Sequence, residues 1–200
     1  ASNSFYFKRH FIYTVLGFGF FFLSLKFPYE TLRRTSILVF LISIFFLIFV
    51  LVAGENFGTI NQVWIKIAGV SFQPVELAKL ATILFLATVF STGKNNATSL
   101  EKGFLPFAII LAIPSLLIVA QPDFGSLFIL ILSASSVYFV AGADLRHFFG
   151  GIVVCTLAAL FVIFTNEHVY KRVQVFLDPS LDPLNGGFQV EQAQIAIGSG

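Results

Sequence analysis

The chain has 200 residues, of which 57% are hydrophobic and 11% are charged, and its net charge is +2. Soluble domains carry about 25% charged residues, so these values, with a mean hydropathy of +0.91, indicate an integral membrane protein. The net charge is too small to favour a nucleic-acid partner. A lone cysteine, Cys155, excludes an internal disulfide framework and a cysteine-based metal site.

Apolar runs of suitable length predict six membrane-spanning helices, since a spanning helix needs about 20 mostly apolar residues. The expected fold class is an all-α integral membrane protein, a polytopic helix bundle over residues 1–165. From residue 166 to 200 the chain is more polar and carries prolines and glycines, which predicts an extramembrane loop with turns. In chain order, the six predicted helices are residues 11–27, 35–53, 74–90, 105–120, 125–142 and 147–165.

Six crossings would place the N-terminus, the loop before residue 74, the turn between residues 120 and 125, and the tail on one side of the membrane. The positive-inside rule favours the other loops as cytoplasmic, by a slight excess of basic residues. Those loops contain Lys26, Arg33, Arg34, Lys94, Lys102 and Arg146, against Lys8, Arg9, Lys66, Lys171 and Arg172 on the opposite side.

Four polar groups interrupt or flank the apolar runs, and the crossing parity puts all of them on one side. Ionisable residues are costly at membrane depth, which makes them functional candidates. We therefore expect these groups to build one site. They are Gln73-Pro74-Val75-Glu76 with Lys79, Gln121-Pro122-Asp123, Arg172, and the run from Asp178-Pro179 to Asp182-Pro183.

Each group also has a simpler structural interpretation. Glu76 and Lys79 share one helical face, and they either line a polar cavity or form an ion pair that only holds the helix in place. Asp123 is either a site residue or an acidic N-cap, and Arg172 is either a site residue or an interfacial anchor. Interfacial positions are favoured over metal ligation for the three histidines, His10, His147 and His168.

The order of these motifs resembles the SEDS family (shape, elongation, division and sporulation), the RodA and FtsW type of cell-wall polymerase. Trp64 and then FQPVELAK at residues 72–79 are similar to the family's W…QPSE…K. AQPDFGS at residues 120–126 is similar to AQPDLGT. RV…FLDP…DPLNGGFQ…QIAIGSG at residues 172–200 resembles RV…FLDP…DPxGxGYQ…QxAIGSG. The resemblance covers essentially the whole chain.

The resemblance implies a peptidoglycan glycosyltransferase of the bacterial cytoplasmic membrane with about ten helices. Such enzymes polymerise lipid II into glycan strands outside that membrane, beside a class B penicillin-binding protein. The six predicted helices resemble the family's second to seventh, and the tail resembles the start of its large extracytoplasmic loop. The aspartate proposed as the family's base lies further along that loop, so the resemblance implies an internal fragment that is inactive alone.

For the site, the resemblance implies supporting rather than catalytic residues. A base would activate a sugar hydroxyl of one lipid II, and Arg172 and Lys79 would stabilise the departing lipid diphosphate. Glu76 and Asp123 would orient these cations or the acceptor. A divalent cation, Mg²⁺ or Mn²⁺, is an open alternative, although no spacing of ligands requires one. The residues expected to bind substrate are Trp64, Gln73, Gln121, Asp178 and Gln189.

Three positions depart from the family pattern: Val63, Val75 and Phe188 stand where the family has Arg, Ser and Tyr. The first puts one head-group contact in doubt. A rival function is a flippase for a lipid-linked precursor, which would need polar groups along the whole crossing. The charges lie at one face, which favours an enzyme. A third possibility, a scaffold that only binds partner proteins, would not explain the presence of Glu76 and Lys79.

Overall fold

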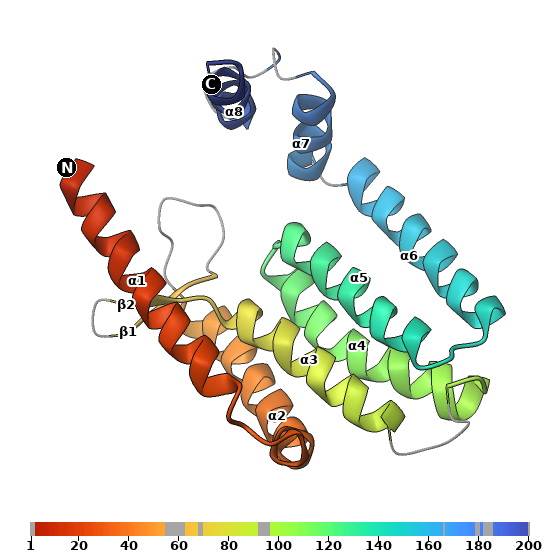
Figure 1. The fold of residues 1–200 in the computed structure, drawn as a ribbon. Helices are drawn as coiled ribbons and strands as arrows, with labels where there is room; N and C mark the ends of the chain where they lie inside the picture. Colours follow the sequence, from red (N-terminus) through yellow and green to blue (C-terminus); the bar gives the residue numbers. More distant parts are fainter. Residues whose placement is uncertain are drawn as a thin grey trace. The chain divides into compact units, whose positions relative to one another are not determined.

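The computed structural model describes the backbone of residues 3–54, 63–67, 70–91, 97–165, 167–178, 181 and 186–199. The side chains of some of these residues, including Arg172 and Gln189, lie outside the described set. The chain divides into two compact units, Ala1–Asp144 and Leu145–Gly200, and helices dominate each of them (Figure 1).

Within the described residues, the first unit contains five α-helices that overlap the predicted ranges, although the first one covers residues 3–24 and not the predicted 11–27. Prolines mark several of their starts: Pro28 precedes one helix, Pro74 begins another, and a third has a proline in its first turn. Proline suits the first turn because its missing N–H has no helical partner there. The helices are α1 Asn3–Ser24, α2 Tyr29–Ala53, α3 Pro74–Ser91, α4 Leu105–Ala120 and α5 Phe124–Val140.

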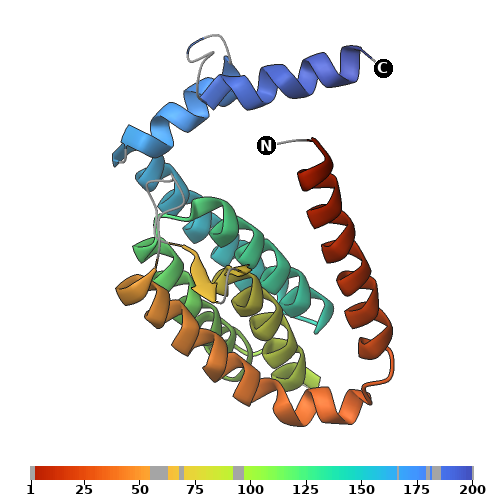
Figure 2. The ribbon, with the colours of Figure 1, turned by 90° about the vertical axis from the view of Figure 1, so that its left-hand side faces the viewer.

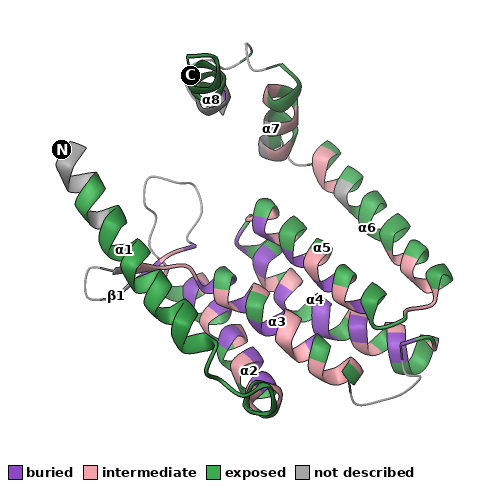
Figure 3. Cartoon of the chain, viewed as in Figure 1, coloured by how far each residue is buried: buried purple, intermediate pink, exposed green. Residues whose placement is uncertain are grey.

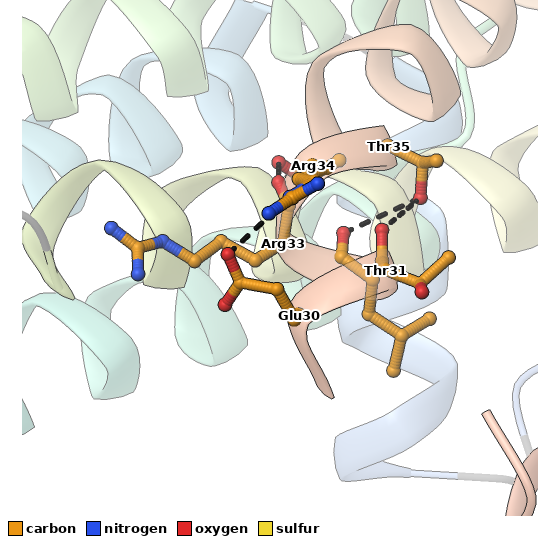
Figure 4. A network of polar contacts seen from close by, with 7 residues as sticks. Glu30, Thr31, Arg33, Arg34 and Thr35 are labelled. Carbon is orange, nitrogen blue, oxygen red and sulfur yellow. Dashed lines mark hydrogen bonds and ion pairs between the residues drawn. The ribbon is translucent and has the colours of Figure 1, made fainter. Parts of the chain in front are cut away.

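Helix α2 begins at Tyr29, earlier than the prediction of residue 35, because polar residues continue the helix beyond its apolar run. Figure 4 shows this first part of α2, where Arg34 Nε lies 3.4 Å from Glu30 Oε1. Thr35 Oγ1 donates a hydrogen bond to the carbonyl of Thr31 at 2.8 Å. The Glu30–Arg34 pair, four residues apart, weakly supports helical turns that hydropathy alone assigns to a loop.

Helices α2, α3, α4 and α5 form the core of the first unit. Helix α2 packs on α3 and α4, α3 packs on α4 and α5, and α4 packs on α5; the four run side by side in Figure 2. The rings of Phe40 and Phe85 stack across the α2–α3 contact at 5.0 Å. Buried residues face the inside of this group, whereas the described side chains of α1 are all exposed (Figure 3).

A short antiparallel hairpin precedes α3 and was not predicted from the sequence. Its strands, β1 Ile65–Ile67 and β2 Val70–Phe72, pair Ile65 with Phe72 and Ile67 with Val70. The ring of Phe72 meets Phe46 of α2 edge-on at 5.7 Å. The hairpin thereby holds the chain against α2 at the point where it delivers Gln73 and α3.

Helix α4 has the predicted bounds, 105–120, and a separate π-helical segment, η1 Leu100–Phe104, runs directly into its start. Ser99 caps the segment, because its hydroxyl accepts a hydrogen bond from the backbone N–H of Lys102 at 2.9 Å. Part of the segment between the predicted helices 74–90 and 105–120 is therefore helical, while residues 92–96 lie outside the described residues.

The described part of the second unit contains three α-helices. The polar composition from residue 166 onward predicted a loop with turns, yet most of the described residues there are helical. Helix α7 packs on α6 and on α8. Helices can form here because Glu167–Leu177 has an amphipathic pattern that mean hydropathy does not detect. The helices are α6 Leu145–Thr165, α7 Glu167–Leu177 and α8 Gly186–Gly198.

All six predicted membrane helices are present as helices. Within the described residues, four stretches are long and apolar enough to cross a membrane, and two further apolar stretches are shorter. The count of six crossings, and with it the side of each loop, stays a prediction. The longer stretches are Tyr29–Ala53, Pro74–Ser91, Leu100–Ala120 and Leu145–Thr165, and the shorter ones are His10–Ser24 and Phe124–Val140.

Candidate functional site

Two of the predicted motifs meet at one end of the α2–α5 core. Gln73 is the residue before α3, and Asp123 is the residue before α5. Gln73 Nε2 donates to Asp123 Oδ2 at 3.4 Å, across 50 residues of sequence. This distance is at the long end for a hydrogen bond, so the contact joins the motifs without fully occupying either side chain.

Asp123 also has the structural role that its position suggested. Its Oδ1 accepts a hydrogen bond from the backbone N–H of Ser126 at 3.1 Å, which caps the first turn of α5. A carboxylate has about four lone-pair sites on its two oxygens. The cap and the contact with Gln73 together leave acceptor capacity on this half-buried side chain, so capping does not exclude a role in a site.

Gln121 ties the turn between α4 and α5 to α2. It is 3% exposed, and its Nε2 donates to the backbone carbonyl of Leu47 at 3.2 Å. An unmade hydrogen bond at a buried amide is costly, so this bond constrains the turn that carries Asp123. Nothing in the sequence indicates that the partner is a backbone carbonyl of α2. The substrate contact predicted for Gln121 stays a prediction.

Glu76 and Lys79 form the predicted ion pair on the first turns of α3. Lys79 Nζ lies 2.8 Å from Glu76 Oε1, and the side chains are 14% and 60% exposed, respectively. Helical spacing alone brings the two groups together. The pair is not buried as a whole, so removing either partner costs less than the loss of a fully buried ion pair. The cation is the enclosed member and the carboxylate is the accessible one.

The departures from the family pattern in the first unit lie in packed surroundings. Val63 is 8% exposed and Val75 is 1% exposed. Valine suits both positions, because a buried apolar side chain needs no polar partner. Trp64, one residue after Val63, is half-buried beside the hairpin. Its predicted contact with substrate stays a prediction.

The remaining predicted residues belong to the second unit. Asp178 follows α7 and is exposed, and its backbone N–H donates to the carbonyl of Gln174 at 2.8 Å. The backbones of Arg172 and Gln189 lie in α7 and α8, while their side chains and the Asp182-Pro183 pair lie outside the described residues. The common cavity predicted for Asp123 and Arg172 stays a prediction.

Metal binding also stays open. In the part of the chain that the structure describes, no group of three or more His, Cys, Asp and Glu side chains could hold a metal ion.

The comparisons with known proteins agree with the motifs. The family model for FtsW, RodA and SpoVE, described as "Cell cycle protein", matches residues 1–200. The "Probable peptidoglycan glycosyltransferase FtsW" of Idiomarina loihiensis is 32% identical over 201 residues, which cover 100% of this chain and 49% of that protein. "Stage V sporulation protein E" of Bacillus subtilis is 34% identical over 99% of this chain and 55% of its own length. The chain spans about half the length of the curated relatives it matches.

Two solved structures share the fold. One, described as "Structural coordination of polymerization and crosslinking by a peptidoglycan synthase complex", matches with a TM-score of 0.73 and 30% identity, over 92% of this chain and 55% of that one. The rod shape determining protein RodA of Thermus thermophilus matches with a TM-score of 0.57 and 25% identity, over 68% of this chain and 44% of that one. With the family match over its full length, the chain is a multi-pass membrane protein that belongs to the FtsW/RodA/SpoVE family.

Proposed function

We propose that this chain forms part of a peptidoglycan glycosyltransferase that polymerises lipid II into glycan strands. The observation that carries the proposal is the family match over residues 1–200, together with relatives above 30% identity that bear this activity in their names. The chain has its motifs in the family's order, and two of them are joined in the structure by the Gln73–Asp123 contact.

In the proposed reaction a carboxylate takes the proton from a sugar hydroxyl of one lipid II. That oxygen forms the new bond to the anomeric carbon of the growing strand, and the bond from this carbon to the lipid diphosphate breaks. The departing diphosphate gains negative charge, which nearby cations stabilise. We assign this task to Lys79 and Arg172, and we expect the base to come from a part of the protein that follows this chain.

The roles of the other residues follow from their contacts. Glu76 would orient the ammonium of Lys79, which lies 2.8 Å from its carboxylate. Gln121 would hold the α4–α5 turn, and Asp123 would face the acceptor with the lone pairs that its N-cap leaves free. Gln121 is thus a positioning residue in this scheme, because it acts through the turn. Trp64, Gln73, Asp178 and Gln189 would contact substrate.

We infer that the protein lies in the bacterial cytoplasmic membrane, with the motif side facing out, and works with a class B penicillin-binding protein. The solved relative described as a peptidoglycan synthase complex, which coordinates polymerisation with crosslinking, supports such a partner. The slight excess of basic residues in the segments predicted to face the cytoplasm, which include Arg34 and Lys102, supports the orientation.

The test is polymerisation of labelled lipid II by the full-length protein purified with its partner. We expect glycan polymer, and we expect Lys79→Met to lower the rate by about 10²-fold, the typical effect of removing one preorganised stabilising group. Lys102→Met is the matched control, because Lys102 is an exposed cation on η1, away from the motifs, and it should retain activity.

Transfer of labelled lipid II between leaflets without any lengthening of glycan would contradict the proposal and favour a flippase. Full activity in Lys79→Met would remove Lys79 from the mechanism while leaving the assignment to a glycosyltransferase in place.

A further inference from the structure

Helix α7, Glu167–Leu177, differs from every membrane helix of the chain in the arrangement of its side chains. At 3.6 residues per turn, Val169, Val173 and Phe176 follow one another along one face. Glu167, Lys171 and Gln174 follow the opposite face, and all three are exposed. The helix is therefore amphipathic over its whole length, whereas the charged residues of α2, α3 and α6 are confined to their first two turns and α4 and α5 carry none.

The apolar face of α7 is open in the structure. Phe176 is 81% exposed, Leu177 is 76% exposed and Tyr170 is 44% exposed. Helices α6 and α8 are the described elements that pack on α7, and they leave these side chains uncovered. Exposed large apolar groups that gather on one side of a helix indicate a surface that binds something apolar.

The place of α7 in the chain limits what can reach that face. Helix α6 is one of the stretches able to cross a membrane; it ends at Thr165, and α7 begins at Glu167. Consecutive Cα atoms are about 3.8 Å apart, so two steps of chain keep the start of α7 close to the membrane boundary where α6 ends. The lipid surface is thus within reach of the apolar face.

The charges of α7 are also compatible with a lipid surface. Lys171 is exposed on the polar face, and the sequence places a second cation, Arg172, directly after it. The one acidic residue of the helix, Glu167, lies in its first turn. Helices that lie in a membrane interface combine basic residues on the polar face with aromatic and aliphatic residues on the other.

We propose that α7 lies along the membrane surface as an interfacial helix. Val173, Phe176 and Leu177 enter the boundary between headgroups and acyl chains, and Lys171 faces the phosphates of phospholipid headgroups. The long stem of lysine lets its ammonium reach the phosphates while the helix axis stays at the boundary. This placement does not depend on which reaction the protein catalyses.

The experiment uses the full-length protein in nanodiscs of phosphatidylethanolamine and phosphatidylglycerol, in a background where Cys155 and any other cysteine are serine. A nitroxide is attached at Phe176→Cys and, in a matched variant one helical face away, at Gln174→Cys. The accessibility of each label to oxygen, which concentrates in lipid, and to a water-soluble nickel chelate is then measured by electron paramagnetic resonance.

We expect the label at Phe176 to favour oxygen several-fold over the nickel chelate, at a depth of about 5–10 Å below the headgroups. The label at Gln174 should favour the nickel chelate. Val173→Cys, which lies one turn before Phe176 on the same face, should repeat the result of Phe176→Cys, and this protects the test against a local disturbance at one position.

Two outcomes would overturn the proposal. If the Phe176 and Val173 labels are as accessible to nickel as the Gln174 label, then α7 lies in water. If they are shielded from oxygen and nickel alike, the apolar face packs against protein instead of lipid. Neither measurement requires lipid II or polymerisation, so failure here is separate from failure of the proposed function.

Discussion

The two ends of the α2–α5 core are built differently. At the end where α3 and α5 finish, Tyr138 is fully buried, its ring stacks on Phe107 at 4.4 Å, and its hydroxyl donates to the carbonyl of Ala97 at 2.9 Å. At the end where α3 and α5 begin, the Gln73–Asp123 contact is 3.4 Å long and its members are half-buried. One end is closed by packing, and the other presents polar groups with unused hydrogen-bonding capacity.

The same helices therefore serve two purposes: their aromatic end stabilises the fold, and their polar end carries the candidate functional groups. Phe90 of α3 also lies against the Tyr138 ring, at 5.3 Å, so the aromatic end fixes α3 to α5 through dispersion and ring contacts. The polar end can then carry polar and charged side chains, which would be costly to bury in a core. Substitutions at the aromatic end should act on folding, and substitutions at the polar end should act mainly on activity.

We expect the largest loss of folding stability from substitutions at the aromatic end of the core. Tyr138→Ala removes a buried ring and leaves a cavity between α3, α4 and α5, which should lower the free energy of unfolding by about 3–5 kcal/mol. Tyr138→Phe keeps the ring but leaves the carbonyl of Ala97 without its hydroxyl donor, for a loss of about 1–3 kcal/mol. Denaturant titration in detergent micelles measures both. Equal losses in the two variants would show that the hydroxyl, and not the packing, closes this end.

We expect the next largest loss of stability from a change in the turn that carries Asp123. Gln121→Leu keeps the approximate volume but removes the donor to the Leu47 carbonyl, and we expect a loss of about 1–2 kcal/mol with a larger fall in polymerisation. Gln174→Leu is the control, because Gln174 is an exposed glutamine on α7. A variant at Gln121 with normal activity would contradict its role in positioning the turn.

Removing the charge of Glu76 should lower the stability more than removing the charge of Lys79. Glu76→Gln leaves the enclosed ammonium of Lys79 without its charged partner and should cost about 1 kcal/mol, whereas Lys79→Gln leaves an accessible carboxylate and should cost less. Thermal unfolding of the two single variants measures the difference. Glu30→Gln breaks the exposed pair with Arg34, whose members are 57% and 77% exposed, and should change stability by no more than about 0.5 kcal/mol.

Asp123→Asn should have the smallest effect on stability. Asparagine caps a helix about as well as aspartate, so the free energy of unfolding should change by less than about 0.5 kcal/mol. Polymerisation should nevertheless fall, because the substitution removes the negative charge of the Asp123 side chain. Asp123→Ala, which loses the cap as well, should cost about 1 kcal/mol. If Asp123→Asn polymerises normally, then Asp123 is an N-cap alone.

The sequence determined the features that depend on neighbouring residues. Apolar runs predicted six helices because the burial of apolar side chains in lipid requires continuous stretches, and all six are present as helices. The Glu76–Lys79 pair was also predictable, since a spacing of three residues on a helix brings the side chains together. The N-cap at Asp123 follows from the same local rules.

Tertiary structure decided the contacts between distant segments. Gln73 contacts Asp123, 50 residues away, and Gln121 contacts the backbone carbonyl of Leu47, 74 residues away. No periodicity in the sequence indicates either partner. The hairpin before α3 escaped prediction because three-residue strands have too short a pattern to be recognised, and Phe72 packs against Phe46 only once α2 is in place. Helix α7 escaped because its mean hydropathy is low, although the period of its apolar residues is helical.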